Sequence, residues 1–508
     1  MKNYLQKTSQ YIKAKPYLAL LVVLLICFFI RAYHLIDLFP FTMDEEYQAF
    51  LANNTIKTGH IPLIGVNVAN TGLYLGPLFT WISTILYWFA NGSPIITAWV
   101  SVLISITTCW LLIKTINLLT KDYWLSLIGG LLYSLNPLIV MYDHKFWNPS
   151  LVMCLTVFWL FSLLKSAKNQ KWWIGVFAVL GLSFHIHYSL FILILPTFVE
   201  IFRQWKLIKL NKRKIFVKNI TIKFILIIGI CILPLLIFEI RHNFIQLTSF
   251  RQYLFFSEKI NLAIWYRFWI LYASVNRLLW LGFNRDLAIE MSLASSSKST
   301  LLMPLSIIFP LSLTYIYFGK RYWQFGKIFI TIFISFITAL LFFKSLVSEY
   351  YFLPLFPLCL ILIMLVLTQH IESRGIKAEY YLGLLLALVL AVWAGQSLTL
   401  KNTLGLKTKL TMIDNIKNLV DNKPYELNAK GKYAYEGYRY LTSWQRVTPV
   451  KSYMDEQFDW LYGSNKALPK TNITIYYKYE PNLLTLIKSE KFDQLIKTEN
   501  FVITRSNL

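Results

Sequence analysis

The sequence is poor in charged residues, and acidic residues are scarcer than basic ones. Only 15% of its 508 residues are charged, with 25 Asp and Glu against 50 Lys and Arg, whereas 56% are hydrophobic and 17% aromatic. Soluble globular domains carry about 25% charged residues. This composition excludes an ordinary soluble protein and indicates a polytopic membrane protein.

Paired cysteines and phosphate-binding loops are also missing. All five cysteines lie within apolar runs, with no C-x-x-C pair and no His at ligand spacing, so we expect neither disulfides nor a metal site. The sequence has no Gly-rich phosphate loop and no inverted repeat, and the lack of a repeat disfavours a transporter. No small-residue cleavage site follows the first apolar run, so we expect this run to be a retained span.

Eleven apolar runs have the length of a membrane span, which is about 20 residues. They lie at 16–35, 94–113, 124–141, 150–166, 172–189, 190–203, 221–239, 301–318, 325–343, 351–369 and 379–397. A further run at 73–89 is ambiguous. If it does not cross, every strongly basic short loop, including the seven charges of 203–218, lies on the side of the basic amino terminus, as the positive-inside rule requires. We therefore predict that 73–89 is interfacial or re-entrant.

The predicted topology gives an all-α membrane protein of about eleven transmembrane helices with a small α/β domain on the outer face. Residues 1–397 form the membrane domain, with large outer loops at 37–93 and 240–300, and residues 398–508 form the outer domain. We expect the protein in the plasma membrane, with its amino terminus in the cytoplasm. In the outer domain, residue patterns predict helices at 408–420 and 488–497 and strands at 473–477 and 501–504.

The stretch "FPFTMDEEYQAF", residues 39–50, places three acids directly after the first span. Thr42 and Glu45 match a capping box, which predicts a helix that runs to about Thr58 and ends at Gly59. The cap accounts for Glu45, and the helix dipole favours Glu46 in the first turn. Asp44 is left without a structural role, and an ionisable group at the membrane boundary is a candidate functional residue.

A first span, then "MDEEYQAFLANNTIKTG", then an apolar stretch introduced by "GPL", resembles the GT-C superfamily of membrane glycosyltransferases. The likeness is greatest to the branch of the lipid A aminoarabinose transferases and protein O-mannosyltransferases, and it covers roughly residues 1–205. It implies that Asp44 lies at the catalytic centre, with Glu45 beside it. Members of this family use sugars carried on polyprenyl phosphate and transfer them outside the cytoplasm.

The second outer loop, "YDHKFWNPSL", departs from the family pattern. The resemblance implies an acid before Pro149, where this chain has Asn148, and the nearest acid is Asp143. This departure argues against a metal held by two carboxylates. Asp143 is either a substrate contact or a loop carboxylate paired with His144 or Lys145, and Lys145 is either a phosphate ligand or an interface anchor.

Three further candidates for substrate binding lie at the outer ends of later spans. His187 is a candidate phosphate or sugar contact, with a buried structural histidine as the alternative. Arg241 opens a loop that is basic although it lies outside, which suits a lipid phosphate because guanidinium groups match phosphate oxygens. Glu349 stands where Pro354 and Pro357 break the entry to a span.

We therefore predict an inverting glycosyltransferase that needs no cofactor. Its expected partners are a polyprenyl-phosphate sugar donor, a glycan, lipid or protein acceptor, and membrane lipid, but not nucleic acid. Two alternatives remain open. One is an oligosaccharyltransferase or glycan polymerase with a diphosphate-linked donor, and the other is a transporter or flippase for lipid-linked glycans.

Overall fold

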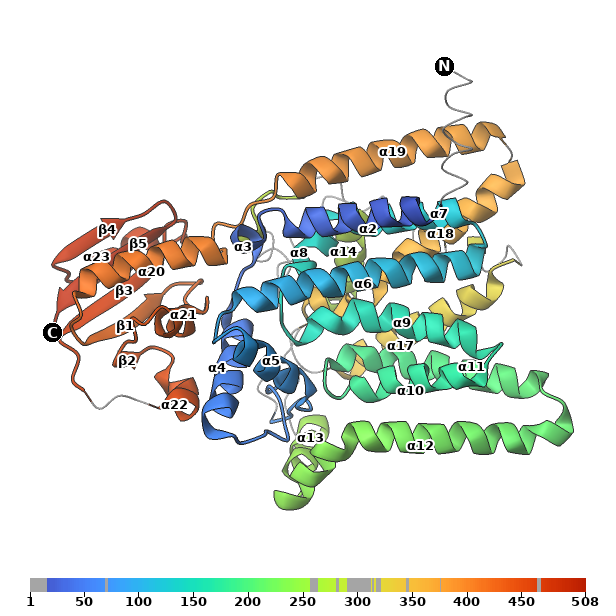
Figure 1. Cartoon of the computed structure of the whole chain (residues 1–508), viewed down its shortest axis with the longest axis horizontal. Helices are drawn as coiled ribbons and strands as arrows, with labels where there is room; N and C mark the ends of the chain where they lie inside the picture. Colours follow the sequence, from blue (N-terminus) through green and yellow to red (C-terminus); the bar gives the residue numbers. More distant parts are fainter. Residues whose placement is uncertain are drawn as a thin grey trace.

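The computed structural model describes residues 16–68, 72–255, 264–279, 283–289, 312, 315–316, 321–343, 347–374, 376–463 and 467–508. Figure 1 shows a bundle of roughly parallel helices with a β-sheet beyond one end. Two helices, α4 and α5, lie at that end of the bundle, on the side where the sheet is found. The acid-rich stretch therefore lies between the helical bundle and the carboxyl-terminal sheet.

The bundle is made of long apolar helices. They are α2 (Pro16–Ala32), α6 (Ile95–Thr120), α7 (Tyr123–Leu135), α9 (Val152–Ser166), α10 (Trp173–Leu182), α11 (Ile194–Leu207), α12 (Leu210–Arg241), α14 (Ile264–Leu279), α17 (Trp323–Phe342), α18 (Leu355–Arg374) and α19 (Ile376–Leu398). Four described helices are long and apolar enough to cross a membrane, and α7 with α8 (Pro137–Asp143), bent by 64°, makes a fifth. The membrane fold is confirmed, but fewer than the predicted eleven described helices are long and apolar enough to cross a membrane. The predicted span 301–318 lies almost wholly outside the described residues.

Several helices expose apolar side chains on the surface of the bundle. Only 6% of the most apolar 18-residue stretch of α12 is buried within the protein, and Ile230 is 71% exposed. Exposed apolar surface of this extent marks contact with lipid rather than with water. A bilayer around the bundle is therefore the physical explanation of the apolar composition.

Helix α4 (Met43–Thr58) begins and ends as the sequence predicts. Glu45 Oε2 accepts a hydrogen bond from the Thr42 amide at 2.9 Å, and Gly59 follows the helix in the left-handed conformation, with a φ of 69°. Helix α5 (Leu78–Phe89) has 12 residues, so it extends about 18 Å, which is less than the bilayer core of about 30 Å. This length suits a helix that does not cross the membrane.

The carboxyl-terminal part contains a mixed five-stranded sheet. Its strands are β1 (Tyr425–Lys430), β2 (Lys451–Ser452), β3 (Thr471–Tyr477), β4 (Gln494–Lys497) and β5 (Phe501–Asn507), in the order β2-β1-β3-β5-β4. Strand β1 is parallel to β2 and β3, and β5 is antiparallel to β3 and β4. The helices of this part are α20 (Leu406–Val420), α21 (Tyr438–Trp444), α22 (Asp455–Tyr462) and α23 (Leu483–Lys488).

One prediction for this part is wrong. Residues 488–497 do not form a helix, because α23 ends at Lys488 and Gln494–Lys497 form the edge strand β4. Each residue of β4 pairs with β5, from Gln494 with Arg505 to Lys497 with Val502. Tertiary pairing with β5 therefore overrides a local pattern that suggested a helix.

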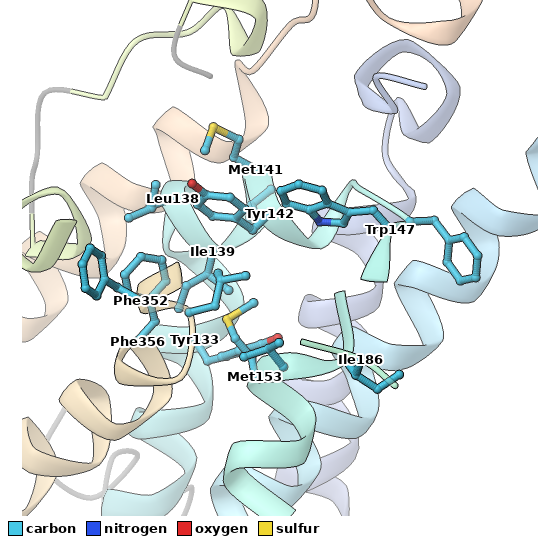
Figure 2. Close-up of a cluster of buried hydrophobic side chains, with 14 of the residues drawn as sticks. Tyr133, Leu138, Ile139, Met141, Tyr142, Trp147, Met153, Ile186, Phe352 and Phe356 are labelled. Atoms are coloured by element: carbon cyan, nitrogen blue, oxygen red, sulfur yellow. The ribbon is translucent and has the colours of Figure 1, made fainter. Parts of the chain in front are cut away.

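A tightly packed apolar cluster supports the loop that follows α8. Figure 2 shows Leu138, Ile139 and Tyr142 of α8 close to Phe352 of the 3-10 helix η5 (Glu349–Phe352) and Phe356 of α18. All but Tyr142 are completely buried, and Tyr142 is 6% exposed. This cluster gives the loop that follows α8 a rigid base.

Candidate active site

Asp44 is the accessible acid of the three at the start of α4. Its side chain is 59% exposed, whereas Glu45 and Glu46 are 1% and 0% exposed. The two buried acids point into the protein, where Glu45 bonds to Thr42 and Glu46 accepts a hydrogen bond from the Tyr440 amide at 2.7 Å. Asp44 is therefore the acid that an incoming molecule can reach.

Lys145 lies beside Asp44, although the two residues are a hundred positions apart in the sequence. Its Nζ is 4.0 Å from Asp44 Oδ2 and 3.8 Å from Glu45 Oε1. Desolvation by the surrounding protein raises the pKa of the Asp44 carboxyl, and the charge of Lys145 opposes this shift. The pair combines a carboxylate that can take a proton with an ammonium that can hold an anion.

Aromatic rings line the neighbourhood of this pair. The Lys145 ammonium lies 3.9 Å from the centre of the Trp147 ring, and Trp147 packs on Tyr350 at 4.7 Å between ring centres. His187 contacts Tyr350 and Tyr351 at 5.6 and 5.5 Å. Asp44 lies close enough to both tyrosines to act on them electrostatically. The structure therefore brings Asp44, Lys145 and His187 into one region lined by aromatic rings.

Asp143 and Asn148 flank the loop that follows α8 but are engaged within the protein. Asp143 pairs with Arg31 at 2.8 Å and accepts a hydrogen bond from the Tyr133 hydroxyl, so its partner is neither His144 nor Lys145. Asn148 accepts a hydrogen bond from Gln48 at 2.8 Å. These contacts tie α2 and α4 to the loop that follows α8 and thereby fix the position of Lys145.

The remaining candidates lie away from Asp44 or are buried. Glu349 is 2% exposed, accepts a hydrogen bond from the Tyr142 hydroxyl and pairs with Arg277. Arg241 is exposed at the end of α12, and among the described residues no hydrogen bond or ion pair joins it to Asp44. Arg267, another arginine of the basic segment 240–300, is buried in α14 and donates to the carbonyl groups of Leu340 and Phe343.

The segment that leads into α4 is held by residues of the carboxyl-terminal part that the motif analysis missed. The Lys409 ammonium, which is completely buried, donates to the carbonyl oxygens of Pro40 at 2.6 Å and Phe41 at 3.1 Å and pairs with Glu436 at 2.8 Å. The backbone of Leu406 also donates to the Phe39 carbonyl. One signal of this contact was present, because Lys409 falls on the apolar face of α20.

A segment within the helical bundle matches a known family in sequence. Residues 75–238 match the family model of the dolichyl-phosphate-mannose-protein mannosyltransferases. The chain is similar to membrane glycosyltransferases of the GT-C superfamily. This match confirms the resemblance and the enzyme class predicted from the sequence. No curated protein sequence matches the chain.

Solved structures show the same fold along nearly the whole chain. The crystal structure of ArnT from Cupriavidus metallidurans bound to undecaprenyl phosphate has a TM-score of 0.54 and 13% identity, and covers 96% of this chain and 97% of its own. The apo structure of the same protein has a TM-score of 0.56 and 13% identity, and covers 97% and 98%. The ArnT-like fold therefore includes the carboxyl-terminal sheet as well as the membrane helices.

Proposed function

We propose that this protein transfers a sugar from a polyprenyl-monophosphate donor to an acceptor hydroxyl on the outer face of the plasma membrane. The observation that carries this proposal is the accessible Asp44 carboxylate beside the Lys145 ammonium within an aromatic-lined place. The undecaprenyl phosphate in the ArnT structure supports a lipid phosphate donor for a protein of this fold.

Asp44 acts as the general base in this reaction. Its carboxylate takes the proton of the acceptor hydroxyl as the hydroxyl oxygen bonds to the anomeric carbon. The bond from that carbon to the phosphate oxygen breaks on the opposite face, so the configuration inverts. A pKa above the ordinary value for Asp suits this role, because a base works best when its pKa lies near the working pH.

The leaving group is a phosphate, which needs stabilisation of charge rather than a proton. Lys145 is near enough to Asp44 to hold this phosphate beside the reacting carbon. His187, which lies beside Tyr350 and Tyr351, offers a ring nitrogen as a phosphate contact. Arg241, at the end of α12, binds the phosphate as the donor enters from the lipid. Glu45 supports the site through the helix cap and its proximity to Lys145. Asp143, Asn148 and Glu349 act in this proposal by holding the loops that surround the substrate.

The proposal includes the full predicted topology. Eleven spans place the amino terminus in the cytoplasm, and residues 37–93, 240–300 and 398–508 outside. The non-crossing length of α5 supports this count, because an additional span would move the basic segment 203–218 to the outer side.

The proposal is tested by sugar transfer from a synthetic polyprenyl phosphate donor with purified protein. We expect Asp44→Asn to lower the rate by about 10²-fold or more, the usual scale of a general base. Glu46→Gln is the matched control, because Glu46 is buried two positions away and points to Tyr440. Transfer by a folded Asp44→Asn variant at the rate of the unaltered protein would show that Asp44 is not the base.

A further inference from the structure

A cavity lies on the side of α4 away from Asp44, where α4, the turn between α5 and α6, and the carboxyl-terminal part meet. Its volume is about 540 Å³, which falls within the range of sites for small ligands. Residues from these three regions line it, among them Asn53, Trp88, Arg439 and Trp444. We call it the junction cavity.

The lining of the junction cavity combines positive charge with aromatic faces. Its three cations are Lys57, Arg439 and Arg446, and no acidic residue is among the described residues that line it. Its rings include Trp88, which is 61% exposed, and Trp444. Arginine and lysine select an anion, and aromatic faces pack against the apolar face of a sugar or polyol.

Arg439 is the buried polar group of this cavity. It is 5% exposed, and its guanidinium lies 4.3 Å from the centre of the Tyr462 ring. One of its terminal nitrogens donates to Ser443, whereas its Nε has no hydrogen-bond partner among the described residues. The Nε is itself shut off from the cavity, but the guanidinium belongs to the lining, and its positive charge would attract an anion there.

Amide groups at the wall supply further hydrogen bonds. The Asn53 amide donates to the Tyr440 hydroxyl at 3.0 Å, and this hydroxyl donates to the Gly92 carbonyl at 2.7 Å. The chain of bonds fixes the Asn53 side chain between α4 and the α5–α6 turn, and its carbonyl oxygen remains as an acceptor for a hydroxyl group. The wall therefore offers fixed polar groups that suit a ligand rich in hydroxyl groups.

The junction cavity is separate from the place around Asp44. Asn53 follows Asp44 by nine residues, which corresponds to about two and a half helical turns, so the two side chains point to opposite faces of α4 about 13 Å apart along its axis. Within the described chain, neither Asp44 nor Lys145 lines the cavity. A ligand there does not take part in the bond-making step.

We propose that the junction cavity binds a phosphorylated sugar or polyol, distinct from the reacting groups at Asp44. The ligand's phosphate lies against Arg439 and Arg446, and its ring or carbon chain lies against Trp444. Such a group is part of a soluble or polymeric glycan, or it is the headgroup of an anionic lipid at the membrane surface. The proposal does not depend on the role of Asp44.

The test uses the purified full chain and two probes. Glucose 6-phosphate represents the soluble source, with glucose as its uncharged control, and binding is measured by isothermal titration calorimetry. Phosphatidylglycerol represents the lipid source, and native mass spectrometry counts the molecules that the protein retains. The test variants are Arg446→Asn, which tolerates the positive φ of 60° at this position, and Trp444→Ala. Lys417→Gln, on an exposed position of α20, is the control.

We expect one probe to bind the unaltered protein and to bind Arg446→Asn at least about tenfold more weakly, since a hydrogen bond to a charged group is lost. If the protein binds glucose 6-phosphate but not glucose, the ligand is a soluble or polymeric glycan. If Arg446→Asn retains one phosphatidylglycerol molecule fewer than the unaltered protein, the ligand is a lipid headgroup. The proposal is overturned if neither probe binds, or if Arg446→Asn and Trp444→Ala bind both probes as Lys417→Gln does. Asp44→Asn should bind the probe normally, so this proposal and the proposed function fail separately.

Discussion

Lys409→Met tests whether the carboxyl-terminal part positions the segment that carries Asp44. The substitution keeps the length of the side chain but removes an ammonium that donates to Pro40 and Phe41 and pairs with Glu436. Breaking a buried ion pair by removing one partner costs about 3–5 kcal/mol. We expect a loss of stability of this size, because the Glu436 carboxylate and two backbone carbonyls remain without their donor.

The same change should slow the reaction. Phe41 has a φ of 48° in the left-handed region, so its conformation is held by its surroundings, and it lies three residues before Asp44. A displacement of a reacting group by about 1 Å costs on the order of 10²-fold in rate. We therefore expect a fall in kcat with little change in the KM of the donor, because Lys145 is held by a different loop.

Lys407→Met is the matched control on the same helix. Lys407 is 68% exposed and pairs with Asp37 at 3.3 Å, and an exposed pair contributes only about 0–1 kcal/mol. Thermal unfolding in detergent and transfer kinetics are measured for both variants and for Lys409→Met with Glu436→Gln, which should recover part of the stability. If Lys409→Met equals Lys407→Met in both stability and kcat, the positioning argument is refuted.

Three further predictions concern the same region. If Asp44 is the base, kcat should fall as the pH decreases, with a midpoint above the ordinary Asp pKa of 3.8, and Asp44→Asn should lose this limb. Burial raises the pKa of Glu46 from 4.5 to about 7, so the native state loses up to about 3 kcal/mol as the pH rises from 4.5 to 7. The unfolding temperature of Glu46→Gln should lack this decline, and an equal decline in both would contradict the assignment. Gly405→Ala should lower stability by about 1–3 kcal/mol, because its Cβ would lie 1.8 Å from the Asp37 carbonyl oxygen; an unchanged unfolding temperature would show that the backbone there yields easily.

The start of α4 could be read from local sequence because its signals act over a few residues. Thr42, Glu45 and Gly59 define a helix through contacts between near neighbours, and the structure confirms both ends. The same cap explains why Glu45 is engaged by Thr42 and is not accessible. The enzyme class also came from the sequence, through the order of the span, the acidic helix and the apolar stretch, and the family match confirms it.

The partners of the other charged residues depend on contacts between distant parts of the chain. Asp143 pairs with Arg31 rather than with its neighbours, and β4 is a strand because β5 lies beside it. Lys409 was not identified from the sequence, where its only signal is its place on an apolar helix face, because its partners Pro40 and Phe41 are more than 360 residues away.

The sequence by itself therefore determined the membrane character and the acidic helix, because hydrophobicity and helix capping are local properties, and its resemblance to a known family indicated the enzyme class. Only the tertiary structure decided that Glu46 is buried against Tyr440, which lysine lies beside Asp44 and which surfaces enclose the junction cavity. Those features depend on which distant segments pack together, and packing is a property of the whole chain.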